Sequence, residues 1–203
     1  MRGFVYVQAR MQARYGERLD SAAWNRLESS ASFSVFLKNT RETSMAPWVS
    51  AVDDDVDIHE LEDLLKNHLF IFIQEAESWV PTEWKAAVGW CKKLFELSEE
   101  DGLSSWLKQW RSLWPTKKNQ QQLEELITLI QHHYQHFISL DDPDHGSSAR
   151  QDLKYALELR FRRFAATPGA LFVYLLLLAL DYERLRGDLA SRLLFGDEHE
   201  VDS

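Results

Sequence analysis

The chain has 203 residues, of which 45% are hydrophobic and 12% aromatic, and this composition excludes a largely disordered protein. Its single cysteine excludes an internal disulfide and a zinc site made of several cysteines. The net charge is −9: acidic residues outnumber basic ones 20 to 8 in residues 42–145, whereas basic residues lead 7 to 3 in residues 1–41 and 8 to 5 in residues 146–196. Basic segments around an acidic middle argue against a general nucleic-acid binder.

The N-terminal segment predicts two helices, over Tyr6–Tyr15 and Ser21–Thr40. A secretory signal needs an unbroken apolar block near the start, and Arg10, Arg14 and Arg18 interrupt it. We therefore expect no export signal. The single cysteine also fits a reducing compartment, so we expect a cytoplasmic protein.

Two helices are predicted in the acidic middle of the chain. Asp57 is a good N-cap for the first, and the acidic residues Asp53–Asp55 precede it. Pro81 separates it from the second, for which Thr82 is the predicted N-cap and Ser98–Gly102 the end. The apolar face of the first consists of Ile58, Leu61, Leu65, Leu69, Phe72, Ile73 and Ala76.

Three further helices follow in chain order. A tryptophan-rich stripe runs over Leu103–Trp114, and an apolar stripe over Leu123–Ile138 predicts a longer helix. The segment Ser139–Ser148, "SLDDPDHGSS", predicts a flexible loop and boundary. Leu153–Phe164 then predicts a helix with arginines beside its apolar side. The eight tryptophans lie largely on these stripes, so we expect most of them in the core.

The last helix begins at Pro168 and Gly169 with the apolar run Ala170–Leu180. Crossing a bilayer takes roughly 20 apolar residues, so a run of about 11 is too short. We expect this run to be buried inside the protein. Hardly any segment alternates with period two, so the sequence predicts an all-α fold.

The predicted architecture is a compact bundle of about seven to nine helices. These helices are expected to form a single helical domain over residues 1–203. The acidic tail, residues 197–203, is expected to be disordered.

The charged continuation of the last helix offers two ion pairs at i, i+3. Asp181 can pair with Arg184, and Glu183 with Arg186. Such pairs are expected to stabilise an exposed helix by roughly 0.2 to 0.5 kcal/mol each.

Two constellations could hold a metal. The acids of Asp53–Asp57 have the DDxxD spacing with which some all-α enzymes bind magnesium and a diphosphate, but helix capping explains them better. His132 and His136 share a helix face, with His133 turned away, and no glutamate stands between them as in metalloproteases. No glycine-rich phosphate loop or GxSxG elbow is found. We therefore predict a protein that is not an enzyme and has no metal or cofactor.

Three stretches together resemble the family of C subunits of V/A-type rotary ATPases, which are homologous to the d subunits of the eukaryotic V-type enzymes. The first is "YVQARMQARYGERLD" with "FSVFLKNTRETSMAPWV", and the second is "DIHELEDLLKNHLFIFIQEAESW". The third, "GALFVYLLLLALDYERLRGDLASRLLFG", resembles the family's closing helix, although Arg184 stands where the family favours asparagine. The positions of the third stretch that match are Tyr174, Leu175, Glu183, Leu185 and Arg186.

The resemblance implies one or more helical lobes like those of the C subunits, and a non-enzymatic connector between the central stalk and the membrane rotor ring. The expected partners are stalk and rotor-ring subunits, without nucleic acid and without membrane insertion. Its location would be cytoplasmic, peripheral on the inner face of the cell membrane through a complex. Members of the family are longer, and this chain resembles their first and last portions with a shortened middle.

Partner-binding anchors are expected among aromatic and arginine side chains of the first and last stretches. Two other functions stay open: a free-standing helical adaptor that binds another protein, and a small metal-dependent enzyme that uses the acids around Asp53. The candidate partner-binding residues are Tyr6, Arg10, Arg14, Tyr182, Glu183 and Arg186.

Overall fold

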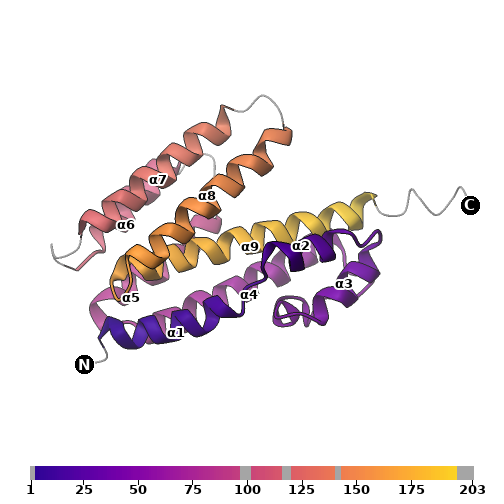
Figure 1. Ribbon diagram of the computed structural model, residues 1–203, viewed down its shortest axis with the longest axis horizontal. Coiled ribbons are helices and arrows are strands. Elements are labelled where there is room, and N and C mark those ends of the chain that lie inside the picture. Colours follow the sequence, from indigo (N-terminus) through magenta and orange to yellow (C-terminus); the bar gives the residue numbers. More distant parts are fainter. Residues whose placement is uncertain (1–2, 97–101, 116–119, 140–142, 196–203) are drawn as a thin grey trace, which may run out of the picture. The chain divides into compact units, whose positions relative to one another are not determined.

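The computed structural model describes residues 3–96, 102–115, 120–139 and 143–195, and within these every regular element is a helix (Figure 1). The all-α prediction is confirmed. The elements are α1 (Phe4–Gly16), α2 (Ser21–Glu28), α3 (Phe33–Arg41), η1 (Ala46–Val49), α4 (Ile58–Trp79), α5 (Thr82–Gly89), η2 (Trp90–Glu96), α6 (Gly102–Ser112), α7 (Gln120–Ile138), α8 (Pro143–Arg163) and α9 (Pro168–Phe195).

The chain divides into two compact units where a single domain was predicted. Unit 1 comprises Met1–Gln12 and Phe72–Leu180, and unit 2 comprises Ala13–Ile71 and Asp181–Ser203. Helices α1, α4 and α9 each contribute one part to each unit. The apolar part of α9 belongs to unit 1, and its charged continuation belongs to unit 2.

The predicted helix Ser21–Thr40 is in fact two helices. The first, α2, ends at Glu28, and Ser32 then caps α3, accepting a hydrogen bond from the Val35 amide at 3.4 Å. Serine side chains compete for backbone hydrogen bonds, so the run of serines around residue 30 favours a break over a continuous helix. The Thr82 cap was wrong as well: Pro81 occupies the N-cap of α5 and makes no side-chain bond there.

The predicted cap of α4 is confirmed. One carboxylate oxygen of Asp57 accepts hydrogen bonds from the amides of His59 and Glu60, at 2.8 and 2.9 Å. These amides have no partner inside the helix, so the cap satisfies them. The hydrogen bond from the Glu60 amide is the main reason that the pKa of Asp57 lies below its usual value.

The core of unit 1 surrounds the apolar part of α9, as predicted for Ala170–Leu180. Eight of these eleven residues are buried and the other three are half-buried. The ring of Phe172 lies 4.8 Å from that of Trp110 on α6 and 6.1 Å from that of Trp84 on α5. Seven of the eight tryptophans are buried, which confirms their predicted place in the core.

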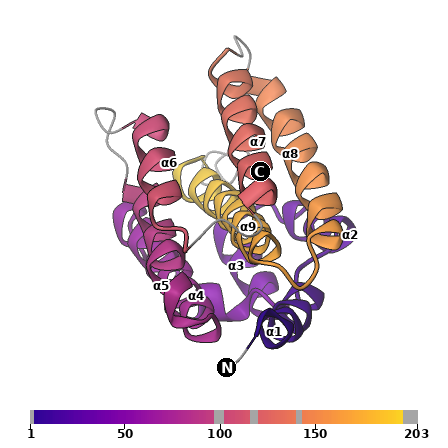
Figure 2. The same cartoon turned by 90° about the vertical axis from the view of Figure 1, so that its left-hand side faces the viewer.

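Helices α7 and α8 run side by side in unit 1 (Figures 1 and 2). The segment Ser139–Ser148 was predicted as a loop, but α8 already begins at Pro143. Proline is favoured at the first position of a helix, where its missing N–H has no partner to lose. Residues 140–142 of that segment, and the acidic tail from residue 197, lie outside the described residues.

Among the described helices, none combines the length and the apolar character that crossing a bilayer requires.

Replacing Leu177 by alanine tests the burial of the apolar run. Leu177 is 0% exposed, so Leu177→Ala is expected to lower the free energy of unfolding by about 2–5 kcal/mol through lost contacts and a cavity. Leu176→Ala, at a half-buried position of the same run, is the matched control and should cost less. Urea unfolding followed by circular dichroism measures both; equal costs would contradict this account of the core.

Candidate interaction site

Four arginines join the charged part of α9 to the other elements of unit 2. We call this set the arginine junction: Arg18, which follows α1, and Arg184, Arg186 and Arg192 of α9. Guanidinium groups have several fixed donors and stay charged, so they suit partly buried contacts between elements. The partners of the junction come from α2, the α2–α3 turn and α4, together with carboxylates of α9 itself.

Arg18 and Asp181 form a buried bidentate ion pair. The Nε and Nη2 atoms of Arg18 donate to the two carboxylate oxygens of Asp181, at 2.6 and 2.9 Å. The exposed fractions of the two side chains are only 8% and 6%. A buried charge is costly without a matching partner, so each residue requires the other.

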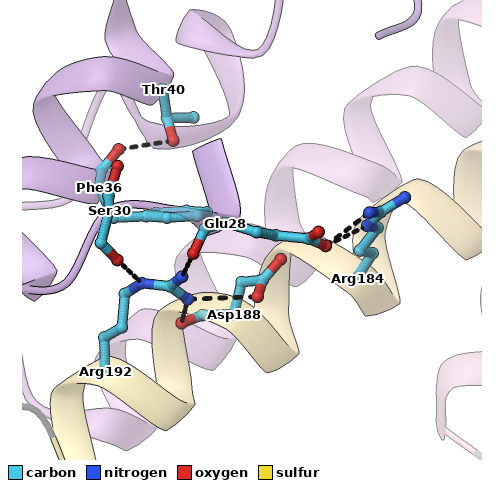
Figure 3. Close-up of polar contacts among 7 residues, drawn as sticks. All are labelled: Glu28, Ser30, Phe36, Thr40, Arg184, Asp188 and Arg192. Carbon is cyan, nitrogen blue, oxygen red and sulfur yellow. Dashed lines mark hydrogen bonds and ion pairs between the residues drawn. The ribbon is translucent and has the colours of Figure 1, made fainter. Parts of the chain in front are cut away.

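Arg192 holds the end of α2 (Figure 3). Its Nη2 donates to the Glu28 carbonyl at 2.8 Å and its Nε to the Ser30 carbonyl at 2.9 Å. Its Nη1 donates to the Asp188 carbonyl and carboxylate, at 2.8 and 3.2 Å. The guanidinium also lies over the ring of Phe36, 4.3 Å from its centre. Carbonyls at a helix end lack helical partners, so Arg192 supplies what the end of α2 needs.

The side chain of Glu28 is held by a second arginine of α9 (Figure 3). The Nε of Arg184 donates to Glu28 Oε1 at 2.7 Å, and its guanidinium lies 4.6 Å from the ring centre of Trp24. Burial, and then the negative charge of Glu28, raise the pKa of Asp188 above its usual value. Because this folded-state pKa is raised, ionised Asp188 costs stability at neutral pH, and the cost is relieved as pH falls through that pKa.

Arg186 connects α9 to α4. Its Nη1 donates to Glu62 at 3.0 Å and its Nη2 to Glu183 at 2.9 Å. The nearby Tyr182 is buried, with its ring centre 6.4 Å from that of Trp48. Burial, helped by the charge of Glu183, raises the pKa of Tyr182 to about 12, so its hydroxyl stays protonated at neutral pH.

One of the two predicted ion pairs within α9 forms and the other is replaced. Glu183 and Arg186 pair as predicted. Asp181 and Arg184 bind Arg18 and Glu28 instead. These partners lie more than 150 residues earlier in the chain, so spacing within one helix carried no signal for them.

The six candidate partner-binding residues are divided between the two units. In unit 1, the Nε of Arg10 donates to the hydroxyl of Tyr6 at 3.2 Å. In unit 2, Arg14 makes a partly exposed pair with Glu17 at 3.3 Å. Tyr182, Glu183 and Arg186 lie at the arginine junction, where Tyr182 is 5% exposed. Tyr6 and Arg10 thus belong to unit 1 and the other four to unit 2, and their role in binding a partner stays a prediction.

The candidate metal ligands cap a helix, pack against an aromatic ring or are exposed to solvent. Asp57 caps α4, and His133 on α7 packs beside Phe137, with ring centres 6.1 Å apart, while His132 and His136 are exposed. Within the described residues, no group of three or more histidine, cysteine, aspartate or glutamate side chains has a geometry that could hold a metal ion.

Comparison of the chain with protein-family models, with curated proteins and with solved structures gives no match.

The arginine junction can fix elements in place, and its arginines already bind carboxylates or backbone carbonyls. Such an arrangement suits mechanical stiffness and the display of a defined surface. Sequence reasoning missed Glu28, Ser30 and Arg192. A signal for Arg192 was present, since it is a basic residue in the last turn of α9, but nothing in the sequence identified backbone carbonyls of α2 as its partners.

Removing Arg18 should be strongly destabilising. Arg18→Met leaves Asp181 buried without its cation, so we expect the free energy of unfolding to fall by about 3–5 kcal/mol. The double variant Arg18→Met with Asp181→Leu removes both charges and should recover most of that loss. Chemical denaturation of the two variants measures both effects.

Arg14→Met is the matched control, because the side chains of Arg14 and Glu17 are 39% and 58% exposed. Loss of such a surface pair should cost less than about 1 kcal/mol. A cost for Arg18→Met no greater than that for Arg14→Met would rule out a buried pair.

His68 on α4 should make the stability of the protein depend on pH. Its ring lies 5.1 Å from that of Trp48, and burial lowers its pKa below the usual 6.5. Because the folded-state pKa is lowered, the unfolded chain takes up the proton first as pH falls. Stability is therefore expected to be retained above pH 6.5 and lost as pH falls through the folded-state pKa.

Urea midpoints at about pH 7.5 and about pH 5.5 measure this dependence. His68→Gln, which does not titrate, should show a smaller loss between the two pH values. His59→Gln, at an exposed position of the same helix, should keep the wild-type dependence.

Proposed function

We propose that this protein is a non-enzymatic structural connector of the kind found among the C subunits of rotary ATPases, joining the central stalk to the membrane rotor ring. One observation carries the proposal. The three stretches that resemble the family all contribute to unit 2. The first supplies Arg18, Phe36 and Trp48, the second supplies Glu62, and the third supplies Asp181, Tyr182, Arg186 and Arg192.

Their contacts are of the kind a connector requires. A part that transmits torque must keep its elements in register under load. In unit 2 the charged part of α9 is fixed to the residue following α1, to α2 and to α4 by separate arginines. These bonds are directional and several are partly or fully buried, so they resist sliding better than an apolar face alone.

A pull-down from native membranes tests this function. The full chain with an affinity tag is expected to co-purify the stalk and rotor-ring subunits of a rotary ATPase, identified by mass spectrometry. The proposal is wrong if the tagged protein is soluble and expressed but no ATPase subunits are enriched. Enrichment of an unrelated protein instead would favour the free-standing adaptor.

A variant makes the test specific. The Arg18→Met and Asp181→Leu double variant removes the buried pair without leaving a lone charge, and it should fold while holding α9 less firmly. We expect it to co-purify less of the ATPase subunits than the wild type does. Arg26→Met, at an exposed position of α2 outside the three stretches, is the control, and its recovery of these subunits should equal that of the wild type.

A further inference from the structure

Helix α8 has an apolar stripe that the described residues leave uncovered. On one side its apolar side chains are packed into unit 1, whereas on the other side Tyr155 and Leu159 are 63% and 49% exposed. Isolated exposed apolar side chains are common, but two that lie one turn apart on the same face form a continuous surface. The packed side of α8 and the residue that follows it consists of Ala149, Leu157, Phe161 and Phe164.

Charged residues of opposite sign stand at the two ends of this stripe. Asp152 lies three residues before Tyr155, and Arg162 lies three residues after Leu159, so all four share one helix face. Both charged side chains are exposed. We call Asp152, Tyr155, Leu159 and Arg162 the outer α8 stripe.

Neither charged end of the outer α8 stripe has an ion-pair partner in the part of the chain that the structure describes. The arginines on either side of Arg162 behave differently, since Arg160 and Arg163 both bind Glu125 of α7. The charges of Arg162 and Asp152 are therefore not neutralised by an ion pair within the described part of unit 1.

The spacing of the outer α8 stripe is symmetric. Its steps are three, four and three residues, so Asp152 and Arg162 are equally far from Leu157, as are Tyr155 and Leu159. If two copies of α8 lie antiparallel about a two-fold axis at that level, Asp152 faces the partner's Arg162 and Tyr155 faces the partner's Leu159. The two-fold axis repeats both contacts, which is the self-complementarity that a symmetric dimer requires.

We propose that the outer α8 stripe is a homodimer interface in which two copies of this chain pair their α8 helices antiparallel. Parallel pairing would place like charges opposite each other at both ends, so the charge pattern selects the antiparallel arrangement. From Asp152 to Arg162 the stripe spans about 15 Å, so the interface is small and the dimer is weak and reversible. The inference is independent of the rotary ATPase function.

Sedimentation velocity of the full chain over a wide concentration range tests the dimer. The expected result is a monomer that converts reversibly to a dimer as concentration rises. Added salt should weaken the association, because the end contacts are exposed ion pairs. A single monomeric species up to the solubility limit would overturn the proposal. The outer α8 stripe would then be a candidate binding surface for a different protein.

Charge reversal tests the register. Arg162→Asp or Asp152→Arg alone places like charges opposite each other twice, and each should raise the dissociation constant at least about tenfold. The Asp152→Arg and Arg162→Asp double variant exchanges the charges and should restore the dimer. A mixture of the two single variants should form a heterodimer, because every end contact then again joins an aspartate to an arginine.

Two controls separate the stripe from general surface effects. Arg150→Asp makes the same change at an exposed position of α8 off the stripe and should leave dimerisation unchanged. Leu159→Asp should abolish it, whereas Ile138→Asp, at an exposed apolar position of α7, should not. Far-ultraviolet circular dichroism confirms that each variant is folded. A dimer that survives both Leu159→Asp and Arg162→Asp would place the interface elsewhere.

Discussion

The burial of α9 is the constraint on which the described structure depends. Its first part, Ala170–Leu180, is apolar on nearly every side and cannot be left in water, so the helices of unit 1 must enclose it. Its continuation from Asp181 is rich in charge, and unit 2 meets it with arginine–carboxylate and arginine–carbonyl contacts. In unit 1 the helix is therefore enclosed by apolar contacts, whereas in unit 2 it combines buried apolar residues such as Leu185 and Leu189 with these polar contacts. Its sequence changes character at the residue where the units divide.

The polar contacts of unit 2 differ in how much each contributes to the stability of the fold. The pair of Arg18 and Asp181 is buried and bidentate, so the loss of one partner leaves the other as an unpaired buried charge. The side chains that pair Arg184 with Glu28 and Arg186 with Glu62 are between 30% and 42% exposed, so solvent screens these pairs and each contributes less to stability. Arg192 binds mainly backbone carbonyls, which remain acceptors at every pH. The arrangement thus has one buried ion pair that is sensitive to mutation and several weaker contacts that set orientation.

Local sequence rules predicted the elements better than the contacts between them. The apolar period gave α4, α6, α7 and α9, and the Asp57 cap followed from residue type alone, because these features depend on neighbours within a few residues. The break between α2 and α3 was missed because the apolar period continues across serines whose side chains favour caps. The partners of Asp181 and Arg184 were missed for a different reason. Helical spacing offered a nearby partner for each, and the tertiary fold supplied a better-placed one.

The sequence indicated which two segments contribute to the candidate site, but it did not indicate which of their residues contact each other. The charged end of α9 and the basic N-terminal segment were both predicted to supply functional residues, and in unit 2 Arg18 does bind Asp181. Tyr182 was expected at a partner surface because aromatic residues are frequent there. The same large apolar ring is equally suited to burial, and the structure places it beside Trp48.

The termination of α2 by Arg192 has a consequence for biosynthesis. The carbonyls of Glu28 and Ser30 receive their donors from a side chain that is translated more than 160 residues later. A nascent chain that has emerged only as far as α8 contains α2 and α3 but lacks the group that closes the turn between them. The turn between α2 and α3 therefore gains these two hydrogen bonds only after the last turns of α9 have been synthesised.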